Sequence, residues 1–157
     1  MSTHTPPIYR SRVHEPMVQR LAMTKLPGAE RTLFPTIREL LCFAALLGYS
    51  EGRRSKLDRA AGVEDVSYQQ FERGDAEDLI YLLALAETKD PEVLKEGEEQ
   101  RCADIFEEFA NGGLEILGET LRRTGGEHPD RDILELMAKS GYLDVDDGEP
   151  DVSNISF

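Results

Sequence analysis

The chain has 157 residues and a formal net charge of −13, so it is long enough for one hydrophobic core and strongly acidic. No apolar run approaches the roughly 20 residues of a membrane helix, and the first dozen residues contain no signal-peptide-like stretch, so we expect a soluble, cytoplasmic protein with no membrane partner. Cys42 and Cys102 lie in apolar helical patterns without a CxxC partner, which favours reduced core thiols over a metal site.

The N-terminal region is predicted to begin with a flexible arm. Residues 1–13 include two adjacent prolines and lack periodic apolar content. Residues 14–23 then place Met17, Val18 and Leu21 on one side of a short helix. Pro27-Gly28 indicates a turn, and Pro35 stands where a proline is tolerated, in the first turn of the next helix.

The strongest helical pattern of the first half covers residues 35–49. Apolar side chains recur there at helical spacing: Ile37, Leu40, Leu41, Ala44 and Leu47. Further along, residues 66–71 are rich in strand-favouring side chains and are predicted to be extended. A strand this short needs a hairpin or a second subunit to pair with.

A third helix is predicted after Asp75, which serves as N-cap with Asp78 three residues later. The following residues, 79–86, are apolar on every side of the helix. Such a helix is usually buried, so we expect it to be the central one. Asp90-Pro91 then has the pattern of an N-cap followed by proline, which opens a short turn.

The second half contains a long helical pattern over residues 98–123. One face carries Ile105, Phe106, Phe109, Gly113, Ile116, Leu117 and Leu121. The acidic residues that should lie away from it, on a solvated surface, are Glu107, Glu108, Glu115 and Glu119. Pro129 opens a last helix that Gly141 closes.

These elements predict a mainly α fold. We expect a small single-domain bundle of about four to five helices, with a short extended segment or hairpin between helices. The domain should cover residues 14–143, between the flexible arm 1–13 and an acidic tail, 144–157.

Motifs for catalysis, nucleotides and metals are not found in the sequence. His4, His14 and His128 are scattered and lack a nucleophile motif such as GxSxG. There is no Walker loop, GxGxxG turn or HExxH helix. The stretch 144–148 has its glycine one position too early for a calcium loop and Ile155 where a glutamate is needed. We therefore predict no enzyme activity, no cofactor and no metal.

The charge is unevenly distributed along the chain. Residues 1–60 carry 10 Lys+Arg against 5 Asp+Glu, whereas residues 61–157 carry 8 against 26. Four cations cluster directly after the 35–49 helix: Arg53, Arg54, Lys56 and Arg59. This basic cluster is a candidate for contacts with nucleic-acid phosphates. The alternatives are a loop that only aids solubility, or one that pairs with the acidic half of the same chain.

A second candidate lies inside the long helix, where Asn111, Gly112 and Gly113 follow one another. Each glycine in a helix interior costs about 1 kcal/mol relative to alanine, so a compensating cause is expected. The candidates are a break in the helix, the close approach of another helix, or a backbone left open to a partner.

Three stretches together resemble the DNA phosphorothioation-associated protein 4 family, also called dnd system-associated protein 4. They are residues 37–54 (IRELLCFAALLGYSEGRR), residues 78–91 (DLIYLLALAETKDP) and residues 105–117 (IFEEFANGGLEIL). The resemblance covers roughly residues 30–123. A more distant likeness is to the DNA sulfur modification protein DndE, through the motif Asn-x-Gly-Leu-Glu-Ile-Leu at 111–117.

The resemblance implies a place beside the enzymes that put sulfur into the DNA backbone, or beside the restriction machinery linked to that mark. The leading hypothesis is a non-enzymatic accessory subunit of such an antiviral defence system, which helps it engage double-stranded DNA through the basic cluster. The alternative is an acidic protein-interaction or regulatory subunit that does not contact DNA. A nuclease with an unrecognised carboxylate site is a third alternative. Its partners would be other proteins of the system, and a homo-oligomer is compatible with the sequence.

Overall fold

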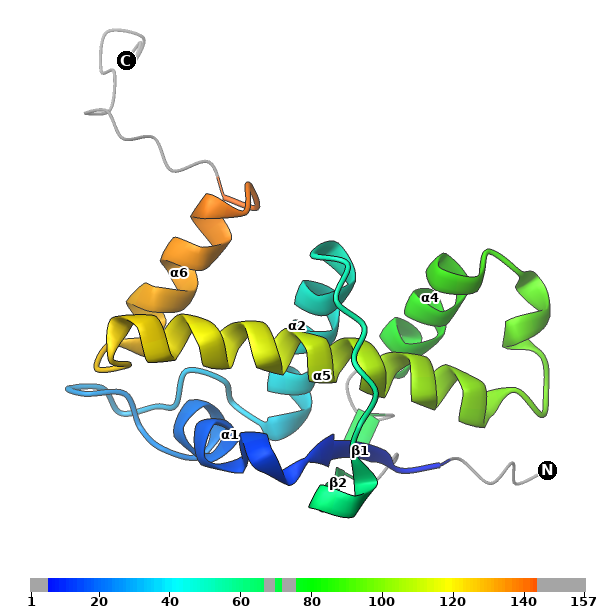
Figure 1. Cartoon of the computed structure of the whole chain (residues 1–157), viewed down its shortest axis with the longest axis horizontal. Helices are drawn as coiled ribbons and strands as arrows, with labels where there is room; N and C mark the ends of the chain where they lie inside the picture. The colour runs from blue at the N-terminus through cyan, green and yellow to red at the C-terminus, as the bar shows by residue number, and fades with distance from the viewer. Residues whose placement is uncertain (1–5, 67–69, 72–75, 144–157) are drawn as a thin grey trace, which may run out of the picture.

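The computed structural model describes residues 6–66, 70–71 and 76–143. Its described helices are α1 (Glu15–Ala22), α2 (Ile37–Ser50), α4 (Ala76–Thr88), α5 (Glu99–Thr124) and α6 (Pro129–Lys139) (Figure 1). The short elements are β1 (Ile8–Ser11), β2 (Val63–Val66) and the 3₁₀ turns η1 (Arg12–His14), η2 (Arg59–Ala61) and η3 (Pro91–Leu94). The predicted fold class, a small mainly α single domain, is confirmed.

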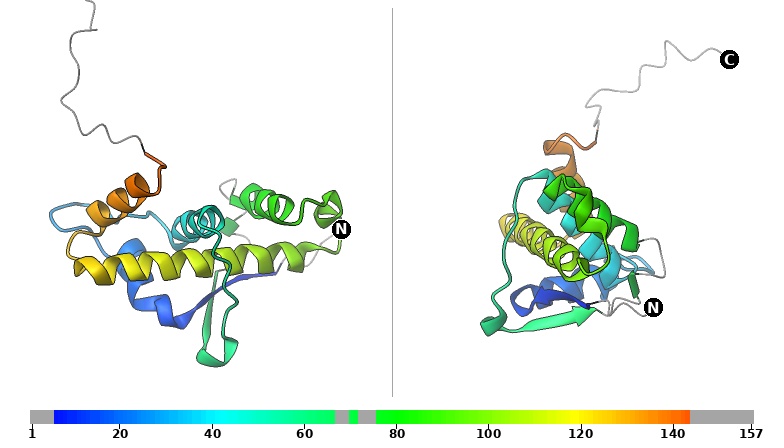
Figure 2. Two further views of the ribbon diagram at one scale, coloured as in Figure 1. Left: turned by 45° about the horizontal axis from the view of Figure 1, so that its top comes forward. Right: turned by 90° about the vertical axis from the view of Figure 1, so that its right-hand side faces the viewer.

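Helix α5 is the axis of the molecule. Helices α2, α4 and α6 lie along one side of it, and α1 with the two strands lies on the other (Figures 1 and 2). The face predicted from the sequence forms the core, together with further buried residues of α5: Ala103, Ala110 and Leu114. Because neighbours cover α5 from both sides, more of its residues are buried than of any other described helix.

The prediction that the apolar run 79–86 forms the most buried helix is wrong. Within α4, the fully buried side chains are Ile80, Leu83 and Ala84, whereas Leu82 is 61% exposed. Helix α4 packs on the N-terminal half of α5 and on η3, which leaves its opposite side open. Burial depends on how many neighbours surround a helix, and hydrophobicity alone does not set that number.

The prediction of a flexible arm through residue 13 fails for its described part. Strand β1 pairs antiparallel with β2, with Ile8 opposite Val66 and Ser11 opposite Val63. Ile8 is 0% exposed, and the strand packs on α5. A strand of four residues has too little pattern to be recognised alone, and its pairing partner is more than 50 residues away in the chain. The extended segment lies at 63–66. Of the predicted range 66–71, residues 67–69 are outside the described residues, and the prediction is wrong for Gln70 and Phe71, which are helical. Asp75 and the tail from residue 144 also lie outside the described residues.

Most helix ends follow the predicted local signals. The prediction that Pro35 stands in the first helical turn is wrong, because α2 begins at Ile37 and Pro35 lies before its N-cap. The Thr36 hydroxyl caps α2 by accepting a hydrogen bond from Glu39 N at 3.1 Å. Asp90 caps η3 in the same way, through Glu92 N, and Pro129 is the first residue of α6. Gly141 adopts the left-handed conformation with φ +83° directly after α6. Among the described helices, none combines the length and the apolar character needed to cross a membrane.

Candidate functional site

Two glycines of α5, Gly112 and Gly113, lie where the backbone of another chain segment closely approaches the helix. The helix is continuous through Asn111-Gly112-Gly113. A Cβ atom at Gly112 would overlap the carbonyl oxygen of Arg53, and one at Gly113 would overlap that of Ala44 in α2. Gly48 makes the reciprocal contact from α2, against the carbonyl oxygen of Phe109. The glycines therefore let α2 and the loop after it rest directly on the backbone of α5.

Asn111 fastens this loop to the helix. Its Nδ2 donates to the carbonyl oxygens of Ser55 at 3.1 Å and Lys56 at 3.4 Å. Its Oδ1 lies 2.9 Å from Nε2 of His14, at the end of η1. The backbone N–H of Ser55 also donates to the carbonyl oxygen of Glu108 at 3.0 Å. One buried amide thus joins the N-terminal segment, the basic loop and α5.

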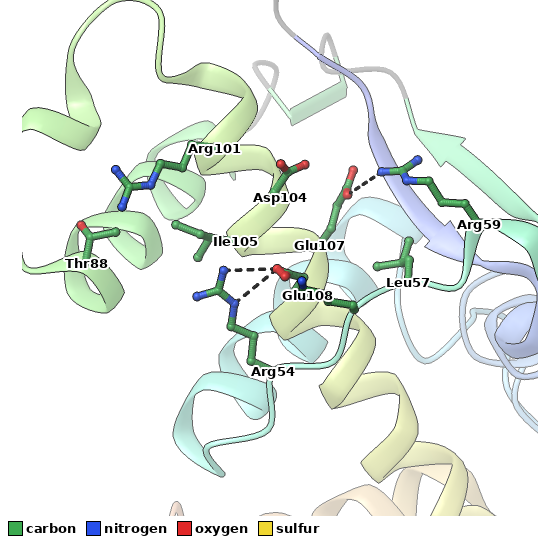
Figure 3. A pocket seen from close by; sticks show the side chains of 10 residues that line it. Arg54, Leu57, Arg59, Thr88, Arg101, Asp104, Ile105, Glu107 and Glu108 are labelled. Atoms are coloured by element: carbon green, nitrogen blue, oxygen red, sulfur yellow. Dashed lines mark hydrogen bonds and ion pairs between the residues drawn. The ribbon is translucent and has the colours of Figure 1, made fainter.

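The loop is held so that its arginines lie over acidic residues of α5. Arg53 Nη1 is 2.9 Å from Glu119 Oε1. Arg54 Nη2 is 3.2 Å from Glu108 Oε2, as Figure 3 shows. Arg59 Nη2 is 3.5 Å from Glu107 Oε2, and the same guanidinium lies over the Tyr9 ring, 4.8 Å from its centroid.

Lys56 differs from the other members of the basic cluster. It is exposed, and it forms no ion pair within the part of the chain that the structure describes. Three of the four cations predicted to contact phosphates therefore have anionic partners within their own chain. This is the pairing between the basic loop and the acidic half that the sequence left open as an alternative.

A hollow of about 460 Å³ lies between the basic loop, the end of α4 and the first half of α5 (Figure 3). Its lining combines four cations and three carboxylates: Arg54, Lys56, Arg59, Arg101, Asp104, Glu107 and Glu108. The remaining lining residues are Leu57, Thr88 and Ile105. Because both cations and carboxylates line the hollow, its charge does not favour anionic ligands over cationic ones.

Glu107 is the most perturbed acid of this site. The sequence predicted a solvated side chain, but it is only 2% exposed, so that prediction is wrong. Burial raises the pKa of Glu107 to about 7, despite a hydrogen bond from Tyr9 N at 2.8 Å and the charge of Arg59, both of which lower it. The 3.5 Å separation from Arg59 is long for an ion pair, so burial dominates.

A sequence signal for Glu107 exists in the small and apolar residues around it. Ala103, Ala110 and Leu114 stand four residues before, three after and seven after Glu107, and all three are buried. This spacing marks a second buried stripe on α5, which faces β1. Small side chains in that stripe leave room for the strand to approach.

Other sequence candidates do not form a reactive centre in the described residues. His14 is engaged by Asn111, and burial lowers its pKa. Cys42 and Cys102 are free thiols, and burial raises the pKa of Cys42 to about 11. Within the described chain, no three His, Cys, Asp or Glu side chains gather as a metal-binding group.

Comparison with known proteins gives one match. The sequence model of a family described as DNA sulphur modification system-associated protein 4 matches residues 8–155. No curated protein and no solved structure shows significant similarity to the chain, so the distant likeness to DndE gains no support. The family match spans nearly the whole chain and includes the Asn111-Gly112-Gly113 crossing and the basic cluster. The chain therefore belongs to the DNA sulphur modification system-associated protein 4 family.

Proposed function

We propose that this chain is a non-catalytic accessory subunit that docks on another protein of a DNA sulphur modification system through an acidic surface. The observation that carries the proposal is the internal pairing of Arg53, Arg54 and Arg59 with glutamates of α5. Three cations that could have attracted phosphates already face carboxylates of the same chain, while the chain as a whole carries a net charge of −13. Such a surface repels DNA and attracts a basic protein.

The acidic docking surface lies at the end of the molecule formed by α4, η3 and the start of α5. Residues 76–104 carry nine Asp and Glu side chains against three Lys and Arg. Two large apolar side chains are exposed in their midst, Leu82 at 61% and Leu94 at 46%. Both line a hollow of about 340 Å³ together with Asp78, Tyr81 and Leu85.

This combination matches the usual anatomy of a protein interface. Exposed apolar side chains beside a hollow supply the desolvated centre, which carries most of the binding energy. The surrounding carboxylates supply orientation and fast association with a cationic partner. We therefore expect the partner to present apolar side chains within a Lys- and Arg-rich surface.

The test uses the purified proteins of the cognate modification system, titrated one at a time against this chain by calorimetry. The double variant Leu82→Ser, Leu94→Ser should bind its partner among these proteins about tenfold more weakly, or weaker still. Leu134→Ser is the matched control, because Leu134 is 56% exposed but lies on α6. The proposal fails if none of these proteins binds, or if the control weakens binding as much as the double variant.

A second candidate function, contact with DNA through the basic cluster, is supported by Lys56, which is exposed and forms no ion pair with any described residue, and by the other three cations that line the hollow with it. This function requires DNA phosphates to displace Glu107, Glu108 and Glu119 from the arginines that they contact. Replacing Arg53, Arg54, Lys56 and Arg59 with glutamine would then reduce the slope of log affinity against log salt by about 3 to 4. An unchanged slope, in the isolated chain and in the reconstituted complex, would leave only the docking function.

A further inference from the structure

A hollow of about 490 Å³ lies towards the C-terminal end of α5. Figure 1 shows that this end of α5 is far from α4 and η3, which form the acidic docking surface. Residues of η1 and α1 form one wall: Val13, His14, Pro16, Met17 and Arg20. The other wall comes from the last turns of α5 and the residues after it: Gly118, Leu121, Arg122, Gly125 and Gly126. This groove thus contains two arginines and no carboxylate among its lining residues.

The two arginines of the groove form no ion pair with any described residue, and both are exposed: Arg20 and Arg122. Two carboxylates on the same helix as Arg122 pair with Arg53 instead: Glu115 and Glu119 lie 3.9 Å and 2.9 Å from its Nη1. The charge of Arg122 acts on Glu119 without a direct ion pair between them.

The fold gives Arg20 a defined position. A Cβ atom at Gly126 would lie 2.8 Å from Arg20 Nη1, so the absence of a side chain at Gly126 leaves space for the guanidinium. Met17 and Leu121, both largely buried, supply an apolar floor. Attraction to the negative ends of helices explains an arginine in the last turn of α1 and another in the last turn of α5. It does not explain why both line one groove without a carboxylate.

We propose that this groove binds the phosphodiester backbone of DNA. A guanidinium presents N–H donors in a planar fork that matches two phosphate oxygens, and two such groups in one groove suit a run of phosphates. No Phe, Tyr or Trp side chain lines the groove, and its one ring, the His14 imidazole, is held by Asn111, so the groove offers little stacking surface for bases. Contact is to the backbone and is independent of base sequence. The site is separate from both the basic cluster and the acidic docking surface, so a subunit docked on a protein through α4 and η3 keeps this groove free.

The first experiment locates the contact on the full chain. The ¹⁵N-labelled protein is titrated with a DNA duplex of about one helical turn at low salt, about 20 mM, where charge attraction is least screened. The amide signals of Gly125 and Gly126 should shift, and replacing Arg20 and Arg122 together with glutamine should abolish those shifts. Absence of any shift at Gly125 and Gly126 in the parent protein would overturn the proposal.

The second experiment separates a defined site from general charge. Two phosphate contacts contribute about 1.8 to the slope of log affinity against log salt. The Arg20→Gln, Arg122→Gln double variant should lose that part of the slope and bind about tenfold more weakly. Arg131→Gln is the matched control, since Arg131 is exposed and also forms no ion pair with described residues, but lies on α6 outside the groove. If the control and either single variant of the groove lost the same amount of affinity for DNA, binding would depend on net charge alone.

An acidic peptide is the competing ligand for two unpaired arginines. A poly-glutamate peptide with the same number of charges as the duplex is therefore titrated in parallel. Preference for the duplex supports the proposal. Equal or tighter binding of the peptide at Gly125 and Gly126 would assign the groove to acidic protein segments instead. Neither result depends on the Leu82 and Leu94 variants, so this proposal and the docking function can fail separately.

Discussion

His14 and Asn111, 97 positions apart in the chain, are joined by a contact of 2.9 Å between Nε2 and Oδ1. The same Asn111 side chain donates through Nδ2 to the carbonyl oxygen of Ser55. Asn111 therefore joins both the N-terminal segment and the basic loop to α5, in a position that is 7% exposed. The basic loop keeps its place because of this amide as well as because of its ion pairs.

Replacing Asn111 with alanine should lower the free energy of unfolding by about 1 to 3 kcal/mol, because the change leaves buried partners without hydrogen bonds. Chemical denaturation measures the loss. Gln100→Ala is the control on the same helix, since its side chain bonds Asp104 at the surface and should contribute little. A loss no larger for Asn111 than for Gln100 would contradict the role of Asn111 as a fastening point.

Gly113→Ala should strongly destabilise the fold. Alanine favours a helix by about 1 kcal/mol over glycine, but here its Cβ would overlap the backbone oxygen of Ala44 and force α2 away from α5. We expect a net loss of about 1 to 3 kcal/mol or more, or failure to fold. Thermal unfolding followed by circular dichroism measures this.

Gly118→Ala is the matched control for the glycine prediction. A Cβ at Gly118 would meet only the Met17 sulfur, at an ordinary 3.9 Å. The variant should gain up to about 1 kcal/mol from helix propensity alone. Similar effects of the two substitutions would mean that the helix crossing does not require close backbone contact.

The pH dependence of stability should reveal Glu107. Its pKa is about 7 in the folded protein, against an ordinary value of 4.5. The folded state therefore keeps a proton that the unfolded state has lost, so this residue's contribution to stability falls as pH rises from about 4.5 to about 7. The full effect is at most about 3 kcal/mol. Glu107→Gln should gain stability relative to the parent across this window, measured by denaturation at several pH values.

Glu119 should affect the pH dependence of stability in the opposite direction to Glu107. The hydrogen bond from Arg53 lowers its pKa, so any contribution is present above the ordinary value of 4.5 and is lost as pH falls. Glu119→Gln should therefore differ from the parent at neutral pH and converge with it in acid. A stability difference between Glu107→Gln and the parent that is constant from pH 4.5 to pH 7 would show that Glu107 keeps its ordinary pKa.

Two neighbouring leucines of α4 should respond in opposite ways to the same substitution. Leu83 is buried, so Leu83→Asp places a charge in the core and should unfold the domain. Leu82 is 61% exposed, so Leu82→Asp should change stability by no more than about 0.5 kcal/mol. Thermal unfolding of both variants is the measurement. Unfolding by both would mean that α4 is surrounded on all sides, as its sequence alone suggested.

Local features of the sequence determined where the helices lie. Asp90 and Pro129 mark the starts of η3 and α6, and Gly141 marks the end of α6, because capping and backbone conformation involve residues only a few positions apart. The periodic apolar face of α5 was readable for the same reason. Together these signals were enough to predict a mainly α single domain.

Only the tertiary structure decided what each of these elements contacts. The sequence indicated that two glycines inside a helix have a structural cause. The structure shows that cause: the backbone of Arg53 lies against Gly112 and the backbone of Ala44 lies against Gly113. Glu107 is buried because β1 covers it, and the three arginines of the basic cluster are paired with glutamates because the loop lies along α5. These contacts join residues about 50 to 100 positions apart. Burial, pKa and free charge depend on such neighbours, which no local pattern records.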